Sequence, residues 1–424
     1  MRSAPTRVVV VGGGFAGIYA ASYLAAADLD PGSVEVTLVS DRNYFTFTPL
    51  LAEVVGGGLG REDVTLALPV LAGQRGFHFR EARVEGIDPA RQVIESTVGP
   101  LHYDHLVLAM GAKPRYFGNE ELERNTLPLT SIRDALAIRE RLIRNAELAT
   151  RESNEARKQR LLTVCVAGAG PAGVEVAAEA RHLLGDVLSR YYPSGVEPRI
   201  VVLQGADVIL PGWHPELAAS GLEIMRNRGI EVHLETFVAG YDGEAVRATS
   251  GEKEFEIEAD TLIWTAGTAP SRLAWEGSGE AVRPSGHLET DAYLRVVGSD
   301  GIWAAGDLAS REDPRTGDPY PAVAPIAITQ GIRAAGNIEN TIANRDLEPY
   351  HAHHAGSIVS LGSGAALVDV LGWTLKGPPA WAIYRLAYLM KVVGTRNKLR
   401  VATSLALNRL FEPDISYDRD PGGF

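Results

Sequence analysis

The sequence predicts an α/β fold made of two parallel-sheet domains of one design, the second inserted into the first, followed by a helical module. The run G-x-G-x-x-G occurs twice, over residues 12–17 and 168–173. Each copy follows a short apolar stretch typical of a buried strand, residues 8–11 and 161–166, and precedes small residues typical of a helix. In addition, basic and aromatic residues accumulate after residue 355.

The glycines in both copies have the spacing of a dinucleotide-binding turn. The first glycine permits a tight turn from strand to helix, the second lets the backbone approach a pyrophosphate, and the third lets helix and strand pack closely. The helix that follows presents unpaired N–H groups and the positive end of its dipole to the phosphates. One copy alone among 45 glycines would equally fit an ordinary tight turn. Two copies predict two Rossmann-like domains and two dinucleotides, most simply FAD and a nicotinamide nucleotide.

Composition and charge exclude several classes of protein. The 424 residues suffice for two or three domains, and 45% apolar residues are typical of a globular chain. A formal net charge of −12 argues against general nucleic-acid binding. The single cysteine, Cys165, is expected in a buried strand, so dithiol–disulfide chemistry within the chain is excluded. We expect no signal peptide, no segment long enough to span a bilayer and no metal site.

Residues 1–120 are expected to form the first half of the FAD domain. After the first glycine run, residues 34–39 predict the second strand. Asp41, preceded by Ser40, is the acid expected to accept hydrogen bonds from the adenosine ribose. The alternative is that Asp41 caps a turn or a helix.

Two later segments of this half are expected near the flavin. An aromatic stretch is broken by Pro49, and it either places Thr48 and Pro49 beside the flavin ring or packs on the core as a hydrophobic loop. Residues 106–114 predict a strand that ends in small residues. Ala109 and Gly111 would there bring the backbone close to the nucleotide.

The charged stretch 121–159 is expected to be one solvated connecting helix, because its apolar residues recur at loosely helical spacing. Residues 160–285 are expected to form the inserted nicotinamide domain. Its second strand, residues 199–203, is followed by Gln204 where an acid is typical of NADH-specific proteins. Its last strand ends at Gly267.

The chain is expected to return to the FAD domain over residues 286–355. A strand that begins at Ile302 ends in Gly306 and Asp307. The glycine permits close backbone approach, and the carboxylate can accept hydrogen bonds from the ribityl hydroxyls. The pair is a weak signal alone, but its place after two glycine runs indicates a flavin site.

The last segment, residues 356–424, has its own composition. Residues 371–411 contain no acid and seven basic residues, alternating with tryptophan, tyrosine and leucine. Segments of this kind lie in a membrane surface rather than across it. The alternative is a packed pair of C-terminal helices or a dimer contact, because the apolar stripe is not clean. The basic residues are Lys376, Arg385, Lys391, Arg396, Lys398, Arg400 and Arg409.

The chain resembles the type II NADH dehydrogenases, which are single-subunit, FAD-containing, non-pumping NADH:quinone oxidoreductases. The resemblance covers nearly the whole length. It rests on residues 12–17, 47–51, 168–175, 305–307 and 375–377. It implies two dinucleotide domains, a C-terminal membrane-anchoring module, peripheral attachment at the cytoplasmic face of the cell membrane, and a homodimer.

Two departures from the family bear on the substrates. The segment that usually carries two glutamines at the quinone site here has Pro325 at the first glutamine position, with Thr329 near the second and Gln330 adjacent. This difference concerns the electron acceptor. Gln204 replaces the usual acid, so we expect NADH to be preferred and NADPH to be tolerated.

The resemblance also assigns roles to individual residues. Glu175, in the first turn of the second glycine-run helix, is expected to influence substrate or proton handling, and its alternative is a carboxylate favoured by the helix dipole. Lys376 is expected to approach the flavin from the C-terminal segment and, with Thr48, to complete the catalytic set. The expected cofactor-binding residues are Gly12, Gly14, Phe15, Ala16, Gly17, Ser40, Asp41, Thr48, Val84, Ala109, Gly111, Gly168, Gly170, Gly173, Glu175, Gln204, Gly267, Gly306 and Asp307; those expected at the quinone are Pro325, Thr329, Gln330 and Lys376.

Three functions remain open at this point. The first is the quinone reductase, which the C-terminal segment favours. The second is a soluble flavoprotein reductase that passes electrons to a protein such as a ferredoxin, which the altered quinone segment favours slightly. The third is a non-catalytic flavin redox sensor.

Overall fold

The structure is a computed structural model, and its described residues form two compact units. It describes residues 4–30, 32–192, 197–271, 273, 281–315, 317–352, 356–370, 372–411 and 415–417. The first unit comprises residues 1–46, 66–113 and 269–354, and the second comprises residues 47–65, 114–268 and 355–424. Each unit is described by itself.

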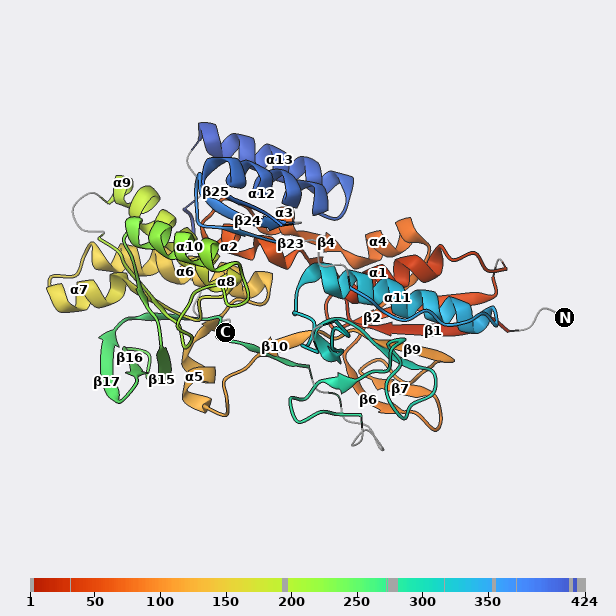
Figure 1. The fold of residues 1–424 in the computed structure, drawn as a ribbon. Coiled ribbons are helices and arrows are strands. Elements are labelled where there is room, and N and C mark those ends of the chain that lie inside the picture. Colours follow the sequence, from red (N-terminus) through yellow and green to blue (C-terminus); the bar gives the residue numbers. More distant parts are fainter. Residues whose placement is uncertain are drawn as a thin grey trace. The chain divides into compact units, whose positions relative to one another are not determined.

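The first unit is built on a five-stranded parallel sheet in the order β21-β9-β1-β2-β5. Helices α1 and α11 lie side by side along it (Figure 1). The main elements are β1 (Thr6–Val11), α1 (Phe15–Ala25), β2 (Val34–Ser40), α4 (Leu68–Arg75), β5 (His78–Glu81), β9 (His105–Leu108), β21 (Ile302–Ala304) and α11 (Ala324–Ile342). Smaller strands are β3 (Tyr44–Thr46), β4 (Thr65–Ala67), β6 (Val84–Asp88), β7 (Val93–Ser96), β8 (Leu101–His102), β10 (Ala112–Pro114), β19 (Thr268–Pro270), β20 (Leu288–Glu289) and β22 (Ala309–Ser310).

The second unit contains a second five-stranded parallel sheet, in the order β11-β18-β12-β13-β14. Its elements are β11 (Leu127–Pro128), α6 (Ile132–Ala149), α7 (Glu155–Leu162), β12 (Thr163–Ala167), α8 (Pro171–His182), α9 (Ser189–Tyr191), β13 (Arg199–Leu203), α10 (Pro215–Asn227), β14 (Ile230–His233) and β18 (Thr261–Trp264). A π-helical turn, Leu183–Leu188, continues α8. Short helices α2 (Leu51–Val55), α3 (Arg61–Val64) and α5 (Glu120–Asn125) also belong to this unit.

The two sheets have the same spatial order of strands and share most of their order along the chain. In each, the strand–helix–strand with the glycine run is followed by a parallel strand, a three-stranded antiparallel meander and a central strand. The edge strand differs, because it comes last in the first sheet (β21) and first in the second (β11). The meanders are β6-β7-β8 in the first unit and β15 (Thr236–Tyr241), β16 (Ala245–Ser250) and β17 (Lys253–Glu258) in the second. The repetition therefore extends well beyond the two glycine runs. The predicted α/β fold with two Rossmann-like sheets is confirmed.

The apolar runs form the central strands because both faces of each sheet are covered. Val8 and Val10 of β1 are fully buried, as are Cys165 and Val166 of β12. Parallel strands covered on both faces read as continuous apolar runs rather than as alternating ones. Cys165 is thus the small core residue that the sequence predicts, and burial raises the pKa of its thiol to about 12.

The predicted single connecting helix over residues 121–159 is wrong, because the structure has α5, α6 and α7 in and around this stretch. Asn154 begins α7, and its side chain accepts a hydrogen bond from the backbone N–H of Arg157. Nor is α6 solvated, since Ile138 and Leu142 are buried. A side-chain cap of this kind starts a new helix and ends the continuity of the old one.

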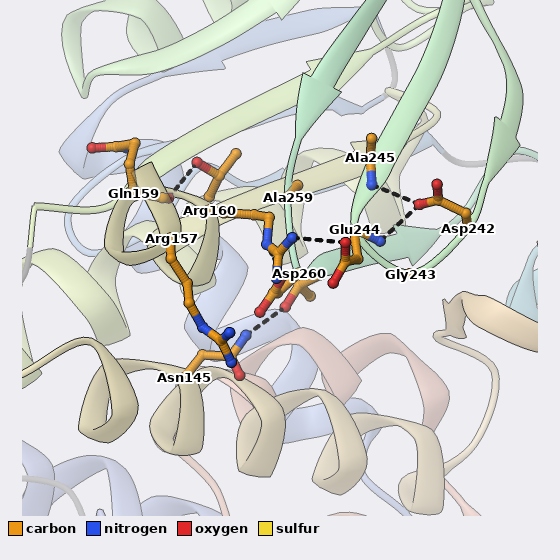
Figure 2. Close-up of polar contacts among 12 residues, drawn as sticks. Asn145, Arg157, Gln159, Arg160, Asp242, Gly243, Glu244, Ala245, Ala259 and Asp260 are labelled. Carbon is orange, nitrogen blue, oxygen red and sulfur yellow. Dashed lines mark hydrogen bonds and ion pairs between the residues drawn. The ribbon is translucent and has the colours of Figure 1, made fainter. Parts of the chain in front are cut away.

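A polar network holds α6 and α7 against β18 and the β15–β17 meander. Arg160 of α7 forms ion pairs with Glu244 at 3.0 Å and with Asp260 at 2.7 Å. Asn145 of α6 donates to the hydroxyl of Thr261 at 3.3 Å. Figure 2 shows the guanidinium of Arg160 between the two carboxylates. The charges that suggested a solvated helix are therefore partly internal contacts.

The C-terminal segment of the second unit combines a sheet with two helices. An antiparallel sheet of β23 (Gly356–Ser360), β24 (Ala366–Val370) and β25 (Trp373–Lys376) carries α12 (Pro378–Lys391), followed by α13 (Thr395–Leu410). Tyr384 of α12 is buried against Ala366 and Val368. The strands were not predicted. Among the described residues, no helix combines the length and the apolar character needed to cross a bilayer.

Candidate functional site

Two glycines of the first glycine run, Gly12 and Gly17, occupy positions that no other residue type fits. Gly12 has a φ of +117°, and a Cβ on it would lie 2.1 Å from the carbonyl oxygen of Ala109. A Cβ on Gly17 would lie 1.9 Å from the carbonyl oxygen of Gly12. Gly14 is different, because nothing lies within 4 Å of its Cβ position at the N-terminus of α1. The turn thus leaves open space in front of a helix N-terminus, which fits a pyrophosphate.

The second glycine run repeats this geometry in the second unit. Gly168 has a φ of +97°, and its Cβ would lie 2.9 Å from the carbonyl carbon of Thr265. A Cβ on Gly173 would lie 2.0 Å from the carbonyl oxygen of Gly168, whereas Gly170, at the N-terminus of α8, again faces open space. Both units therefore present the same open cradle, by which we mean the glycine turn and the open space in front of the helix that follows it.

The Gly-Asp turn after β21 lies beside the first cradle. Gly306 has a φ of +73°, and its Cβ would lie 3.3 Å from the Cβ of Ala16. Asp307 is half-buried and, among the described residues, its carboxylate has no hydrogen-bond partner. Burial raises the pKa of Asp307, and the positive field of His287 opposes that shift. A carboxylate left without a partner here fits a site that a hydroxyl-bearing ligand completes.

Helix α11 supports this turn from the other side. The side-chain oxygen of Gln330 accepts a hydrogen bond from the backbone N–H of Gly306 at 2.7 Å. The hydroxyl of Thr329 lies 2.9 Å from that of Tyr350 and donates to the carbonyl of Pro325 at 3.0 Å. Pro325 occupies the first turn of α11, where a missing N–H costs nothing. Gln330 thus holds the Gly-Asp turn.

The remaining residues expected around FAD in the first unit differ in burial and in the contacts they make. Ser40 is buried, and its hydroxyl accepts from the backbone N–H of Arg42 at 3.3 Å, whereas Asp41 is exposed. Phe15 meets the edge of Phe45 with ring centroids 4.9 Å apart. Ala109 is buried after β9, Gly111 has a φ of +66°, and Val84 begins β6 half-buried. In the second unit, Gly267 is exposed with a φ of +126°.

Gln204 has both ends of its side chain engaged with the backbone. Its oxygen accepts from the N–H of Ala169, inside the glycine run, at 2.8 Å. Its nitrogen donates to the carbonyl of Val208 at 3.1 Å. Gln204 therefore braces the glycine turn against the segment after β13, a task that the sequence analysis did not assign to it.

Glu175 lies in a buried cluster of charges in the second unit. It is 8% exposed, and its carboxylate accepts a hydrogen bond from the backbone N–H of Ser360 at 3.0 Å. Burial raises the pKa of Glu175 to about 8, the Ser360 N–H opposes the shift, and the charges of Glu53 and Glu179 add to it. A carboxyl that titrates near neutrality can hold or release a proton there.

The other members of this cluster are Glu53 of α2, Glu179 of α8 and Arg385 of α12. Glu53 is 2% exposed and forms an ion pair with Arg385. Glu179 is 7% exposed, and burial raises its pKa to about 8. The cluster therefore holds three carboxyls and one guanidinium. The sequence analysis did not predict the cluster. It expected Arg385 among the basic residues at the membrane surface, whereas the structure pairs it with the buried Glu53. Glu179, four residues after Glu175 on one helix, offered a local signal.

Thr48 and Lys376, expected in the catalytic set, are both exposed in the second unit. Thr48 begins a short 3-10 helix, Thr48–Leu50, ahead of α2. Lys376 ends β25, and its ammonium donates to the hydroxyl of Ser220 in α10 at 3.2 Å. The structure gives neither side chain a partner within the buried cluster.

Helices α12 and α13 expose an apolar and basic surface. Large apolar side chains stand out from both helices beside the exposed basic residues Lys391 and Arg396. The exposed apolar residues are Ile383, Leu386, Met390, Leu399, Leu407 and Leu410. Large apolar side chains exposed in a group on neighbouring helices mark an interaction site more often than singly scattered ones do.

Comparison with known proteins agrees with this geometry. Residues 6–331 match the family described as pyridine nucleotide-disulphide oxidoreductase. The type II NADH:quinone oxidoreductase NdhA of Mycobacterium tuberculosis is 32% identical over 418 residues, covering 93% of this chain and 85% of that protein. The type II NADH:quinone oxidoreductase of Staphylococcus aureus is 27% identical over 396 residues, covering 93% and 96%.

A solved structure shows the same fold over nearly the whole chain. It is described as NDH2 from Plasmodium falciparum in complex with NADH. The superposition has a TM-score of 0.89 and covers 97% of this chain and 100% of that chain, with 20% identical residues.

Proposed function

Because the chain belongs to the type II NADH:quinone oxidoreductases, within the pyridine nucleotide-disulphide oxidoreductases, we propose that it oxidises NADH and reduces a quinone, with FAD as its cofactor. The observation that carries this proposal is the pair of open glycine cradles, one in each unit, at Gly14 and Gly170. Two cradles of one geometry serve two dinucleotides. The cradle beside Asp307, whose carboxylate has no hydrogen-bond partner in the described part of the chain, is the one we assign to FAD.

FAD, when bound, supplies the two-electron acceptor between nucleotide and quinone. The protein's own work is to bind, orient and exclude water. The N–H groups at the start of α1 and α8 would hold the phosphates of the two dinucleotides. Gln330 holds Gly306 so that Asp307 could accept hydrogen bonds from the hydroxyls of FAD. The other expected cofactor-binding residues, Thr48 among them, keep their predicted roles as part of this proposal.

Glu175 is the residue to which we assign proton handling. Quinone reduction needs two protons for two electrons, and a hydride brings only one of them. A buried carboxyl with a pKa of about 8 is protonated at neutral pH and can give up that proton without a large cost. Its bond from the Ser360 N–H keeps the carboxyl oriented.

The acceptor side remains a proposal built on Pro325, Thr329, Gln330 and Lys376. The structural roles of Thr329 and Gln330 explain why polar residues occur in this segment, and they leave the identity of the quinone to experiment. The exposed position of Lys376 is compatible with a contact to a substrate that arrives from outside the protein.

We further propose that α12 and α13 bind the surface of the membrane, at the cytoplasmic face where NADH is available. The exposed leucines with Lys391 and Arg396 support this, since apolar area and basic charge together attract a segment to anionic lipid. A homodimer is also proposed by family resemblance, and sedimentation of the purified protein tests it.

One experiment separates this function from its alternatives. The FAD-loaded protein is reduced with NADH without oxygen, and the loss of flavin absorbance is recorded. Reoxidation by a soluble quinone analogue supports the proposal. Reoxidation by a ferredoxin alone would indicate the soluble reductase, and no reoxidation by either would indicate a redox sensor.

A further inference from the structure

One exposed aromatic ring lies close to the segment that follows β13. Phe237, the second residue of β15, is 63% exposed. Among the described residues, no other aromatic ring pairs with it. A phenyl ring kept in water loses the free energy that burial would give it, about 25 cal/mol per Å² of apolar surface. The exposure of Phe237 in the nucleotide-binding unit therefore needs a physical explanation.

Backbone hydrogen bonds hold Phe237 rigidly beside this segment. The N–H of Thr236 donates to the carbonyl of Gln204 at 2.8 Å, and the N–H of Glu235 donates to the carbonyl of Ala206 at 2.9 Å. These two backbone hydrogen bonds fix the residues before Phe237 to the residues after β13. The ring is a fixed feature of the site rather than the tip of a loose loop.

The ring packs on the backbone of Gly205. A Cβ on Gly205 would lie 2.5 Å from Cε1 of Phe237 and 3.0 Å from its Cδ1 and Cζ. Only glycine lets the ring approach this closely. Gly205 directly follows Gln204, the position from which this fold holds the adenosine ribose, and the adenine continues from that ribose at the carboxyl edge of the sheet.

We propose that Phe237 is the platform on which the adenine ring of the nicotinamide nucleotide stacks, which makes it a nucleotide-positioning residue. The inference rests on the proposed function, because that function supplies the nucleotide. Gly205 lies against three carbons of the ring, and the exposed remainder can accept a base. Stacking a base on an aromatic side chain changes affinity by about 5- to 150-fold when the side chain is cut to alanine.

The direct test uses ADP-ribose, which has the adenine and both phosphates but no nicotinamide. Its affinity for the FAD-loaded protein is measured by titration calorimetry. Phe237→Ala should weaken binding about tenfold, and Phe237→Tyr should restore it. Tyr191→Ala is the matched control, because Tyr191 is a comparably exposed ring, 49%, in α9 at the far end of the helix that the glycine run begins. It should bind ADP-ribose like the wild type.

Kinetics with a truncated substrate give a second, independent readout. Reduced nicotinamide mononucleotide lacks adenine, so Phe237→Ala should raise KM for NADH and leave kcat/KM for the mononucleotide unchanged. Gly205→Ala should displace the ring and also weaken ADP-ribose binding. In a Phe237→Ala background, the same Gly205→Ala change should cause no further loss.

Two results would overturn the proposal: unchanged ADP-ribose affinity in Phe237→Ala, or an equal loss with the mononucleotide. A folding defect is recognised because it would also lower the flavin content. Failure of the wild type to reduce any quinone with NADH would instead count against the proposed function, and ADP-ribose binding would still decide the role of Phe237.

Discussion

The backbone N–H of Ser360 donates to the Glu175 carboxylate at 3.0 Å, across a separation of 185 residues. This bond joins α8 to β23 within the second unit, and Glu175 lies beyond the first turn of α8, in which the sequence analysis had placed it. The bond gives the carboxylate a partner other than the helix dipole, so its position is not that of a simple helix cap. With Glu179 nearby on the same helix, the fold concentrates carboxyl groups where burial penalises their ionised form.

Stability should therefore fall with rising pH because of Glu175. Its pKa is raised to about 8 in the folded protein, against an ordinary value of 4.5. Between these values the folded state holds a proton that the unfolded state has lost, so each pH unit costs about 1.4 kcal/mol of unfolding free energy per such carboxyl. Urea unfolding of the holoprotein between pH 5.5 and about 7.5 should show this slope, and Glu175→Gln should reduce it.

The same variant should also change turnover while keeping fold and FAD. Glutamine keeps the shape and can still accept the Ser360 hydrogen bond, but it cannot release a proton. We expect kcat with quinone to fall and its dependence on pH above neutrality to flatten. If the variant has the same kinetics as the wild type with NADH and quinone at every pH, then Glu175 has only a structural role.

Removing the cation that pairs with Glu53 should destabilise the protein strongly. Arg385 pairs with Glu53, which is 2% exposed, so Arg385→Gln leaves a buried carboxylate without compensation. Breaking such a pair from one side costs about 3–5 kcal/mol. The double variant Glu53→Gln with Arg385→Gln should recover much of this loss. Equal stability of the single and double variants by thermal unfolding would show that the pair is not coupled.

Glycines of the first cradle should separate folding from flavin binding. Gly14 faces open space with extended backbone, so Gly14→Val should fold normally and lose FAD, because the side chain would occupy the pyrophosphate position. Gly17→Ala should instead lower the stability of the apoprotein, since its Cβ meets the carbonyl oxygen of Gly12 at 1.9 Å. Circular dichroism and flavin absorbance measure both. Full flavin occupancy in Gly14→Val would mean that the cradle is misassigned.

Basic residues on α12 and α13 should contribute to binding of anionic liposomes. Each basic charge near an anionic surface is worth about 1 kcal/mol, so Lys391→Gln with Arg396→Gln should weaken binding roughly thirtyfold at low salt. Arg75→Gln with Lys253→Gln, two exposed charges on other elements, α4 and β17, is the control. Cosedimentation at low and high salt decides the question, and a wild type that stays in the supernatant at low salt contradicts it.

Local patterns in the sequence predicted the parts of the site that depend on neighbouring residues. The turns at Gly12 and Gly168 and the apolar strands before them follow from spacing alone. The Glu53–Arg385 pair joins residues 332 apart, and no local pattern links the two partners. The break before Asn154 was missed because a loose apolar spacing continues across it. The brace made by Gln204 was missed because its partners are backbone atoms, which every sequence provides.

The selectivity between NADH and NADPH should depend on Gln204. Its two hydrogen bonds to the backbone allow variants that separate its charge from its structural role. An acid at this position binds ribose hydroxyls and repels a 2′-phosphate. Gln204→Glu keeps an acceptor for the Ala169 N–H but loses the donor to the Val208 carbonyl, so one carboxylate oxygen is free to turn toward the ribose. We expect selectivity for NADH to sharpen by roughly 1–3 kcal/mol, with a small loss of stability.

The control for this change is Gln204→Ala, which removes both hydrogen bonds and adds no charge. The glycine turn loses its brace in this variant, so affinity should fall for NADH and NADPH alike and their ratio should stay constant. Wild type should prefer NADH and still turn over NADPH, because its side chain carries no charge to repel the phosphate. The measurement is kcat/KM for both nucleotides in the three proteins. If the ratio of kcat/KM for NADH and NADPH is the same in the glutamate variant and the wild type, the side chain at this position only stabilises the glycine turn and does not contact the ribose.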